Sequence, residues 1–102
     1  YVADKRETAA RYVEFFKGKE DITFFTEPAD CKSNYWLNAV VLKDKVAQLE
    51  FLEYTNDHGV MTRPVWELMN RLPMFEHCET DGLENTEWLA DRVVNIPSSV
   101  RL

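Results

Sequence analysis

The stretch that most constrains the fold is NYWLNAVVLK, residues 34–43, which combines β-branched and aromatic residues in a run of strand length. Asp44 follows it directly, and aspartate is a favoured N-cap residue of helices. Residues 45–57 then carry apolar side chains on one helical face, and Gly59 stands where such a helix would end. The sequence therefore predicts a strand followed at once by a helix near the middle of the chain.

Helix-like and strand-like segments flank this central unit on both sides. In chain order, the sequence predicts a helix at 4–17, a strand at 21–28, the central strand and helix, a strand at 60–62, a helix at 65–72, a helix around Trp88 and Leu89, and a strand at 93–97. Helices and strands mix here without regular β-α-β alternation. The expected fold class is α/β (α+β): a two-layer sandwich with helices packed on one face of a small, largely antiparallel sheet.

Length and charge narrow the class of protein. The 102 residues fit one domain. With 12 Lys and Arg against 18 Asp and Glu, the net charge of -6 argues against nucleic acid as a partner, because phosphate contacts need clustered cations. The longest apolar run, AVVL, is too short to cross a membrane. The two cysteines, Cys31 and Cys78, favour free thiols in the cytoplasm.

Common catalytic motifs are missing from the sequence, including a glycine-rich phosphate loop and G-x-S-x-G. His58 precedes Gly59 at a predicted helix end, where a cationic imidazole favours the helix dipole. His77 and Cys78 are adjacent, but together with Cys31 they match no zinc module. The sequence therefore predicts no catalytic residue and no metal site in this chain.

The corner GVMTRPVWELMNRLPMF, residues 59–75, is the strongest candidate for a binding site. Arg63 precedes Pro64, which suits the first turn of a helix. A helix N-terminus attracts anions, and a guanidinium beside it adds a two-pronged donor for phosphate or carboxylate. Trp66 could stack on a planar or sugar-like group. From these residues alone, the alternative that Arg63 pairs with an acid and Trp66 is buried stays open.

This corner, followed by TEWLADRVVNIPSS at 86–99, resembles the end of the DegT/DnrJ/EryC1/StrS family of pyridoxal-phosphate-dependent sugar aminotransferases. The family's pieces occur here in the same order over nearly the whole chain, at residues 4–17, 35–42, 45–59, 59–64, 65–75 and 86–99. The T-R-P form is most similar to perosamine-synthase-like and legionaminic-acid-type members. The resemblance implies the small domain of a fold-type-I aminotransferase.

The resemblance also implies that residues 1–102 are a single C-terminal small domain of a larger aminotransferase, with the large pyridoxal-phosphate-binding domain upstream and absent here. The implied reaction moves an amino group from L-glutamate to a nucleotide-linked keto-deoxysugar, for surface-polysaccharide or sialic-acid-like sugar biosynthesis. The implied partners are the large domain, these two substrates and a second subunit of a cytoplasmic homodimer, with no nucleic acid and no membrane. No lysine here stands in the family's cofactor context, so this segment alone is expected to bind no cofactor and to be inactive.

Position by position, the resemblance implies that Arg63 meets phosphate or sugar oxygens of the substrate and that Trp66 lines the cleft. Asn70 is the third candidate. Tyr35 and Trp36 approach the cleft edge, although the strand pattern alone places Trp36 in the core. All five would act by positioning and charge stabilisation. The fold alone leaves two alternatives: an independent small-molecule-binding or regulatory module without catalysis, and a protein-interaction domain.

Overall fold

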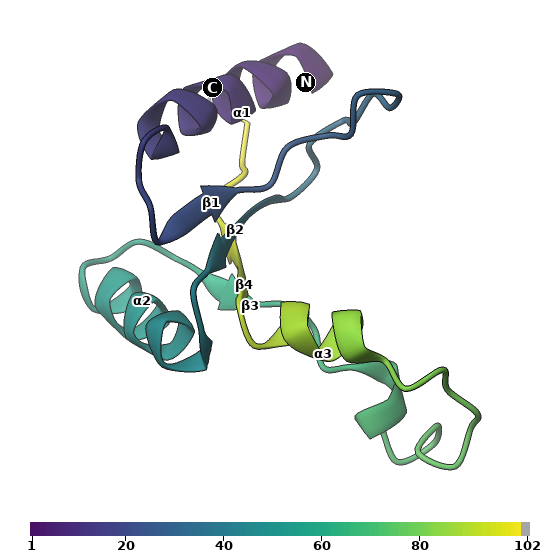
Figure 1. Cartoon of the computed structure of the whole chain (residues 1–102). Coiled ribbons are helices and arrows are strands. Elements are labelled where there is room, and N and C mark those ends of the chain that lie inside the picture. The colour runs from purple at the N-terminus through teal and green to yellow at the C-terminus, as the bar shows by residue number, and fades with distance from the viewer. Residues whose placement is uncertain (101–102) are drawn as a thin grey trace.

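The computed structural model describes residues 1–100, which form one four-stranded antiparallel sheet with helices on one face (Figure 1). In chain order the elements are α1 (Val2–Phe16), β1 (Ile22–Phe24), β2 (Asn38–Leu42), α2 (Lys45–Asp57), β3 (Arg63–Pro64), the 3-10 turn η1 (Met69–Arg71), α3 (Glu84–Ala90) and β4 (Val93–Ile96). The predicted fold class is confirmed. Across the described range, none of the helices is both long and apolar enough to span a membrane.

The strand order of the sheet is β1-β2-β4-β3, so the last strand of the chain lies in the middle of the sheet. β2 pairs with β4 in a register that sets Val40 opposite Val94 and Asn38 opposite Ile96. In an antiparallel pair of this kind, the start of one strand lies beside the end of the other. The N-terminal end of β2 therefore lies beside the C-terminal end of β4.

One hydrophobic core lies between the sheet and two helices. Along β2, burial alternates so that Asn38, Val40 and Leu42 face the helices. α1 and α2 both pack against this face, which explains why the core is shared by both helices. The buried apolar residues are Ala9, Phe24, Val40, Leu42, Val94 and Ile96.

The helix predicted at 45–57 has these bounds in the structure. The side chain of Asp44 accepts a hydrogen bond of 2.8 Å from the backbone N–H of Ala47, as expected of an N-cap. At the other end, Gly59 has a φ of +80°, which only glycine adopts without strain. Local capping chemistry therefore decides both ends of α2.

The segment after α2 differs from the prediction. The strand expected at 60–62 is instead β3, formed by Arg63 and Pro64, and the described residues 65–72 form no α-helix beyond the single turn η1. Pro64 fits an edge strand, because the missing N–H is not needed for a further neighbour. Arg63 therefore does not lie at a helix N-terminus.

The central strand is shorter than predicted at its start. Residues 34–37 turn before β2 begins: Tyr35 has a φ of 48°, and the backbone N–H of Trp36 donates to Asn34 Oδ1 at 3.0 Å. This local hydrogen bond competes with a strand ladder. Trp36 is consequently 64% exposed, so its expected place in the core is wrong.

Residues 65–92, here called the arm, connect β3 to β4 and project away from the sheet (Figure 1). The arm contains η1 and α3, and every residue in it is at least partly exposed. α3 is therefore not part of the helical layer on the sheet. Gln48 of α2 helps to attach the C-terminal end of the arm. It is fully buried, and its Nε2 atom donates to the carbonyl oxygens of Ala90 and Val93, both at 2.9 Å.

Replacing the Gln48 amide with a carboxylate tests this attachment. In Gln48→Glu, an ionised oxygen would face two carbonyl oxygens in a fully buried site, so we expect a loss of about 2 kcal/mol or more at neutral pH. Urea denaturation of the 102-residue chain measures the loss. The exposed Asn85→Asp substitution in α3 is the matched control, with a change within about 0.5 kcal/mol. Equal effects of the two substitutions would contradict the role of Gln48.

Candidate functional site

A groove of about 370 Å³ lies where β2 begins and β4 ends. Its residues come from α1, from the turn before β2, from β3 and its approach, and from β4 and the residues after it, and they include Lys5, Trp36, Met61, Arg63, Asn95 and Ser98. The lining contains two cations and, among the described residues, no Asp or Glu. In a chain with a net charge of -6, such a groove stands out as a place for an anion.

Both cations of the groove are anchored on neutral oxygen atoms. Arg63 Nη1 donates to Asn56 Oδ1 at 3.1 Å and to the carbonyl of Thr62 at 2.8 Å. Lys5 Nζ donates to the carbonyl of Ser98 at 2.7 Å. By contrast, three other arginines form ion pairs with glutamates: Arg6 with Glu27, Arg11 with Glu7 and Arg71 with Glu67. The groove therefore keeps positive charge that no acid in its lining offsets.

Trp36 supplies the aromatic part of the groove. Its side chain is 64% exposed, and its carbonyl lies 3.4 Å from Lys5 Nζ. An exposed indole beside a cation can cover the apolar face of a sugar or base while the cation meets an anionic group. The groove thus combines the two kinds of contact that a phosphorylated organic molecule requires.

The other predicted residues of the corner lie outside this groove. Trp66 is 81% exposed, just after the edge strand β3. Asn70 lines a separate hollow of about 620 Å³ within the arm, together with Leu68, Phe75 and Leu83. Its Oδ1 atom is buried and has no hydrogen-bond partner within residues 1–100. The structure therefore brings Arg63 and Trp36 together, but leaves Trp66 and Asn70 apart from them.

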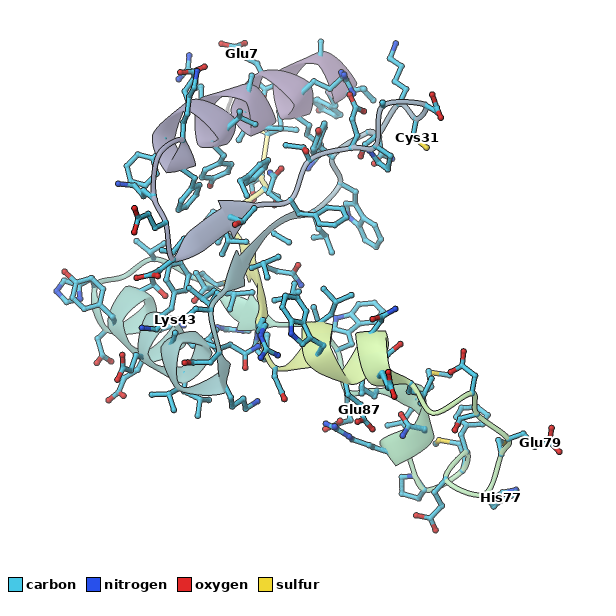
Figure 2. All side chains as sticks on the ribbon, viewed as in Figure 1. Glu7, Cys31, Lys43, His77, Glu79 and Glu87 are labelled. Carbon is cyan, nitrogen blue, oxygen red and sulfur yellow. The ribbon has the colours of Figure 1, made fainter. Side chains whose placement is uncertain are left out.

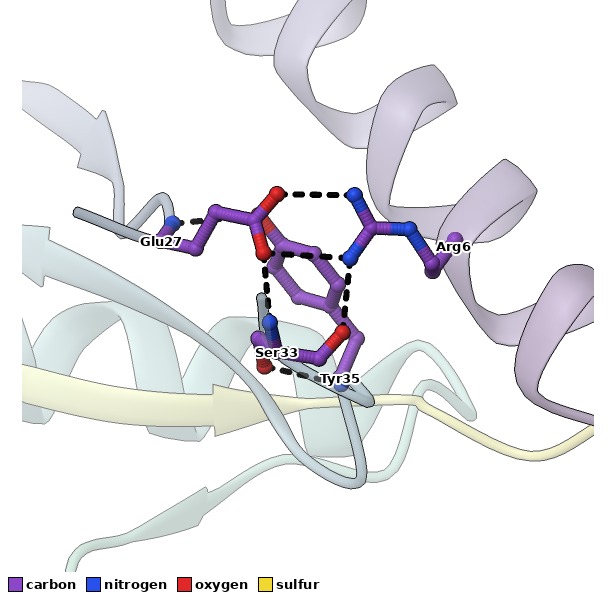
Figure 3. A network of polar contacts seen from close by, with 4 residues as sticks. All are labelled: Arg6, Glu27, Ser33 and Tyr35. Carbon is purple, nitrogen blue, oxygen red and sulfur yellow. Dashed lines mark hydrogen bonds and ion pairs between the residues drawn. The ribbon is translucent and has the colours of Figure 1, made fainter. Parts of the chain in front are cut away.

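Tyr35 belongs to a polar network that joins α1 to the loop before β2 (Figure 3). Arg6 forms two hydrogen bonds to the Glu27 carboxylate, at 2.7 and 3.0 Å, and a third to the carbonyl of Ser33 at 2.6 Å. The Tyr35 hydroxyl accepts from the backbone N–H of Glu27 at 3.1 Å, and the Arg6 guanidinium lies 5.6 Å from the Tyr35 ring centre. Both polar and aromatic parts of Tyr35 are thus engaged within the domain.

This network shifts the pKa of Glu27. Hydrogen bonding to Arg6, followed by the backbone N–H of Ser33, lowers the pKa of the Glu27 carboxyl from 4.5 to about 2. The same hydrogen bond raises the pKa of the Arg6 guanidinium above its ordinary value. Both shifts favour the ionised pair, so the network is a fixed tie between α1 and the loop over the ordinary pH range.

The histidine and cysteine residues form no shared site in the described chain. His58 Nδ1 lies 2.8 Å from the carbonyl of Tyr54, and its ring stacks on Tyr54 at the end of α2, as the helix-end interpretation predicts. Both cysteines are free and exposed, and Figure 2 places Cys31 and His77 at opposite ends of the molecule. Within residues 1–100, no three His, Cys, Asp or Glu side chains gather closely enough to hold a metal ion.

Lys5 and Asn95 are among the groove residues that were not predicted from the sequence. Asn95 lies directly opposite Arg63 in the β3–β4 register and opposite Ala39 in the β2–β4 register, so it fills the space between them. Its only signal in the sequence is a polar residue between two apolar ones, which any half-exposed strand shows. Lys5 has no local signal at all, because its position in the groove depends on how α1 packs.

The domain shares its fold with part of several solved enzymes. The sugar aminotransferase CalS13 from Micromonospora echinospora superposes with a TM-score of 0.77 at 24% identity, over 95% of this chain and 25% of that one. The aminotransferase TlmJ from Streptoalloteichus hindustanus gives a TM-score of 0.83 at 21% identity, over 95% and 26%. The E. coli GDP-4-keto-6-deoxy-D-mannose-3-dehydratase, with bound hydrated PLP, gives 0.73 at 16% identity, over 95% and 26%. The chain thus spans about a quarter of each relative.

The sequence comparison identifies the family. The model of the DegT/DnrJ/EryC1/StrS aminotransferase family matches residues 1–102, the whole chain. The protein therefore belongs to the DegT/DnrJ/EryC1/StrS aminotransferase family. No curated protein sequence matches the chain. The resemblance described from the sequence is confirmed at the level of the family, while the perosamine and legionaminic subtypes remain predictions.

The lowered pKa of Glu27 predicts how stability depends on acid. A carboxyl whose pKa is lower in the folded chain stabilises it above pH 4.5, and this contribution is lost as the pH falls from 4.5 to about 2. We therefore expect Glu27→Gln to unfold at lower urea concentration than the unchanged 102-residue chain at neutral pH, with the difference shrinking toward pH 2. Glu67→Gln, which removes an exposed ion pair, is the control and changes stability little. A constant difference for Glu27→Gln at all pH values would contradict the prediction.

Proposed function

We propose that this chain is the C-terminal small domain of a pyridoxal-phosphate-dependent aminotransferase that moves an amino group from L-glutamate to a nucleotide-linked keto-deoxysugar. In this proposal the domain supplies contacts to the anionic sugar nucleotide and no catalytic group. The products would serve surface-polysaccharide or sialic-acid-like sugar biosynthesis, as in the perosamine-synthase-like and legionaminic-acid-type branches. The site residues are Arg63, Trp66, Asn70, Tyr35 and Trp36, to which the groove geometry adds Lys5.

The observation that carries the proposal is the groove with Lys5 and Arg63 on its walls and no acid in its described lining. A nucleotide sugar carries a diphosphate, which needs charge-assisted hydrogen bonds, and rings that pack well on an aromatic face. Arg63 and Lys5 supply the first, and the exposed Trp36 supplies the second. Membership of an aminotransferase family supports the choice of this ligand over other phosphorylated molecules.

The residues of this chain do not themselves fit a cofactor site. Pyridoxal phosphate serves as an electron sink and is held through a lysine whose amine is activated by burial or by a neighbouring cation. Lys5 is half-buried but donates to backbone carbonyls in an open groove. The other five lysines are exposed: Lys17, Lys19, Lys32, Lys43 and Lys45. We propose that the cofactor is held by the remainder of the protein, of which this chain is about a quarter.

The groove residues act on the substrate by binding and orientation. The guanidinium of Arg63 and the ammonium of Lys5 would hold phosphate oxygens and offset their charge. Fixing the diphosphate on one side and a ring against Trp36 on the other leaves the sugar few orientations. This restricts which carbon of the sugar faces the rest of the enzyme. The domain therefore contributes to specificity and to affinity, while proton transfers take place elsewhere.

The fold by itself does not choose the reaction, since a dehydratase from E. coli shares it. The same argument keeps the non-catalytic binding module as the alternative class. The two differ in what accompanies the domain: a lysine-bearing large domain in the same polypeptide supports the aminotransferase. We further propose a cytoplasmic homodimer, with which the two free, exposed cysteines are compatible.

The first test removes the Arg63 side chain in the full-length enzyme. We expect Arg63→Ala to lower kcat/KM for the accepted UDP-, GDP- or dTDP-linked keto sugar by about tenfold or more, as loss of a charged hydrogen bond does. Steady-state kinetics with each nucleotide sugar measure the change. Arg11→Ala is the matched control, because Arg11 is an exposed arginine paired with Glu7 outside the groove. Unchanged kinetics for Arg63→Ala would make Arg63 a structural residue.

The second test concerns the cofactor. Adding pyridoxal phosphate to the isolated 102-residue chain should give no stable absorbance band of protein-bound cofactor. The reason is that five of its lysines are exposed and the sixth, Lys5, donates to backbone carbonyls. Absorbance spectra before and after gel filtration measure this, with the full-length enzyme as the positive control. A band that survives gel filtration of the isolated chain would contradict the assignment of the cofactor to the remainder of the protein.

A further inference from the structure

We propose that Asn56, held by Thr62, is a positioning residue that fixes the Arg63 guanidinium at the wall of the groove. Asn56 lies near the C-terminal end of α2, and Thr62 immediately precedes β3. Neither residue is among those lining the groove, so their effect on a ligand passes through Arg63. The inference rests on the proposed function of the groove and adds two residues that act from behind it.

The amide of Asn56 connects three parts of the chain. Its Nδ2 atom donates to the carbonyl of Leu52 at 2.7 Å, to Thr62 Oγ1 at 3.0 Å and to the carbonyl of Thr62 at 3.2 Å. Its Oδ1 atom accepts from Arg63 Nη1 at 3.1 Å. A rotated amide would turn N–H groups toward the guanidinium, which has only donors. The hydrogen bonds made by Nδ2 therefore keep the Oδ1 atom of Asn56 directed toward Arg63.

Thr62 gives this amide a rigid support. The residue is 2% exposed, and its Oγ1 atom forms a hydrogen bond of 2.6 Å with Thr55 Oγ1. Thr55 Oγ1 lies 2.8 Å from the carbonyl of Phe51, one turn earlier in α2. A chain of hydrogen bonds thus runs from the backbone of α2 through the two threonine hydroxyls to Asn56. Asn56 itself is exposed, but its hydrogen bonds to the buried Thr62 hold its amide in one orientation.

As a result, the Nη1 atom of Arg63 is engaged within the protein, while the Nη2 and Nε atoms are left to bind a ligand. Nη1 donates to Asn56 Oδ1 and to the carbonyl of Thr62, which accounts for both of its hydrogens. Within residues 1–100, the N–H groups on Nη2 and Nε have no partner, and together they form a fork that suits a phosphate or carboxylate. Holding the long side chain in advance removes rotamer entropy that binding would otherwise cost.

The neutrality of Asn56 is part of this device. A carboxylate at the same position would also orient Arg63, as Glu67 does for Arg71 and Glu27 for Arg6. It would, however, offset the positive charge that an anionic ligand needs. An amide oxygen orients the guanidinium and leaves its charge available. The chain has 18 acidic residues, yet the side chain that orients Arg63 is a neutral amide. A role in binding an anion accounts for this.

The experiment measures binding of UDP, GDP and dTDP to the full-length protein by calorimetry, and then uses the tightest of the three for all variants. We expect Asn56→Ala to raise Kd by about three- to tenfold, the size of one lost hydrogen bond. Thr62→Val, which has the same shape without the hydroxyl, should weaken binding in the same direction, and Thr62→Ser should restore it. Asn56→Asp should weaken binding at least as much as Asn56→Ala, because its carboxylate pairs with Arg63.

A double variant separates positioning from general loss of structure. In the Arg63→Ala background, Asn56→Ala should change Kd by less than about twofold, because no guanidinium remains to be oriented. Asn85→Ala, an exposed asparagine in α3, is the control and should leave Kd unchanged. Additive effects of the two substitutions, or unchanged Kd in both Asn56→Ala and Thr62→Val, would overturn the inference while leaving the groove function intact. If Arg63→Ala itself has no effect, or none of the three diphosphates binds, the proposed function fails and the inference with it.

Discussion

The antiparallel pairing of β2 with β4 is the interaction on which the rest of the structure depends. Val40 and Val94 oppose each other at its centre, and both are fully buried. This pairing brings the start of β2 to the end of β4 and so forms the place where the groove lies. β3 joins the sheet only through β4, in a register that sets Arg63 opposite Asn95. The cationic wall of the groove is thus a consequence of how the hydrophobic strands align.

The parts of the fold that the sequence predicted well are those decided by neighbouring residues. α2 has the predicted bounds because the Asp44 side chain caps the first turn and Gly59 accepts a left-handed backbone. β4 lies within the predicted strand at 93–97, because its β-branched residues favour a strand, and burial alternates along it as in a half-buried strand. The two-layer arrangement followed from the mixture of such elements. In each case the deciding contacts are a few residues apart.

The predictions that were wrong concern residues whose structure depends mostly on contacts outside the predicted element. Pro64 suits the first turn of a helix and an edge strand equally well, and β4, far along the chain, decides for the strand. Arg63 was selected for a helix dipole that does not form, and Asn56 on another element provides its actual environment. The strand pattern predicts Trp36 in the core, but the local turn at Asn34 shortens the strand and leaves Trp36 exposed. Lys5 reaches the groove only through the packing of α1, which no local pattern encodes.

The position of β4 in the sheet also sets the order in which the domain can form during translation. β4 is synthesised after the other three strands of this sheet, yet it lies between β2 and β3. Until its residues leave the ribosome, β2 can pair only with β1, and β3 has no neighbour in the sheet. The core then also lacks Val94 and Ile96. Because such non-local pairing must wait for the whole intervening segment, the nascent domain exposes strand edges until β4 has been synthesised. The groove is therefore among the last features of the domain to be assembled.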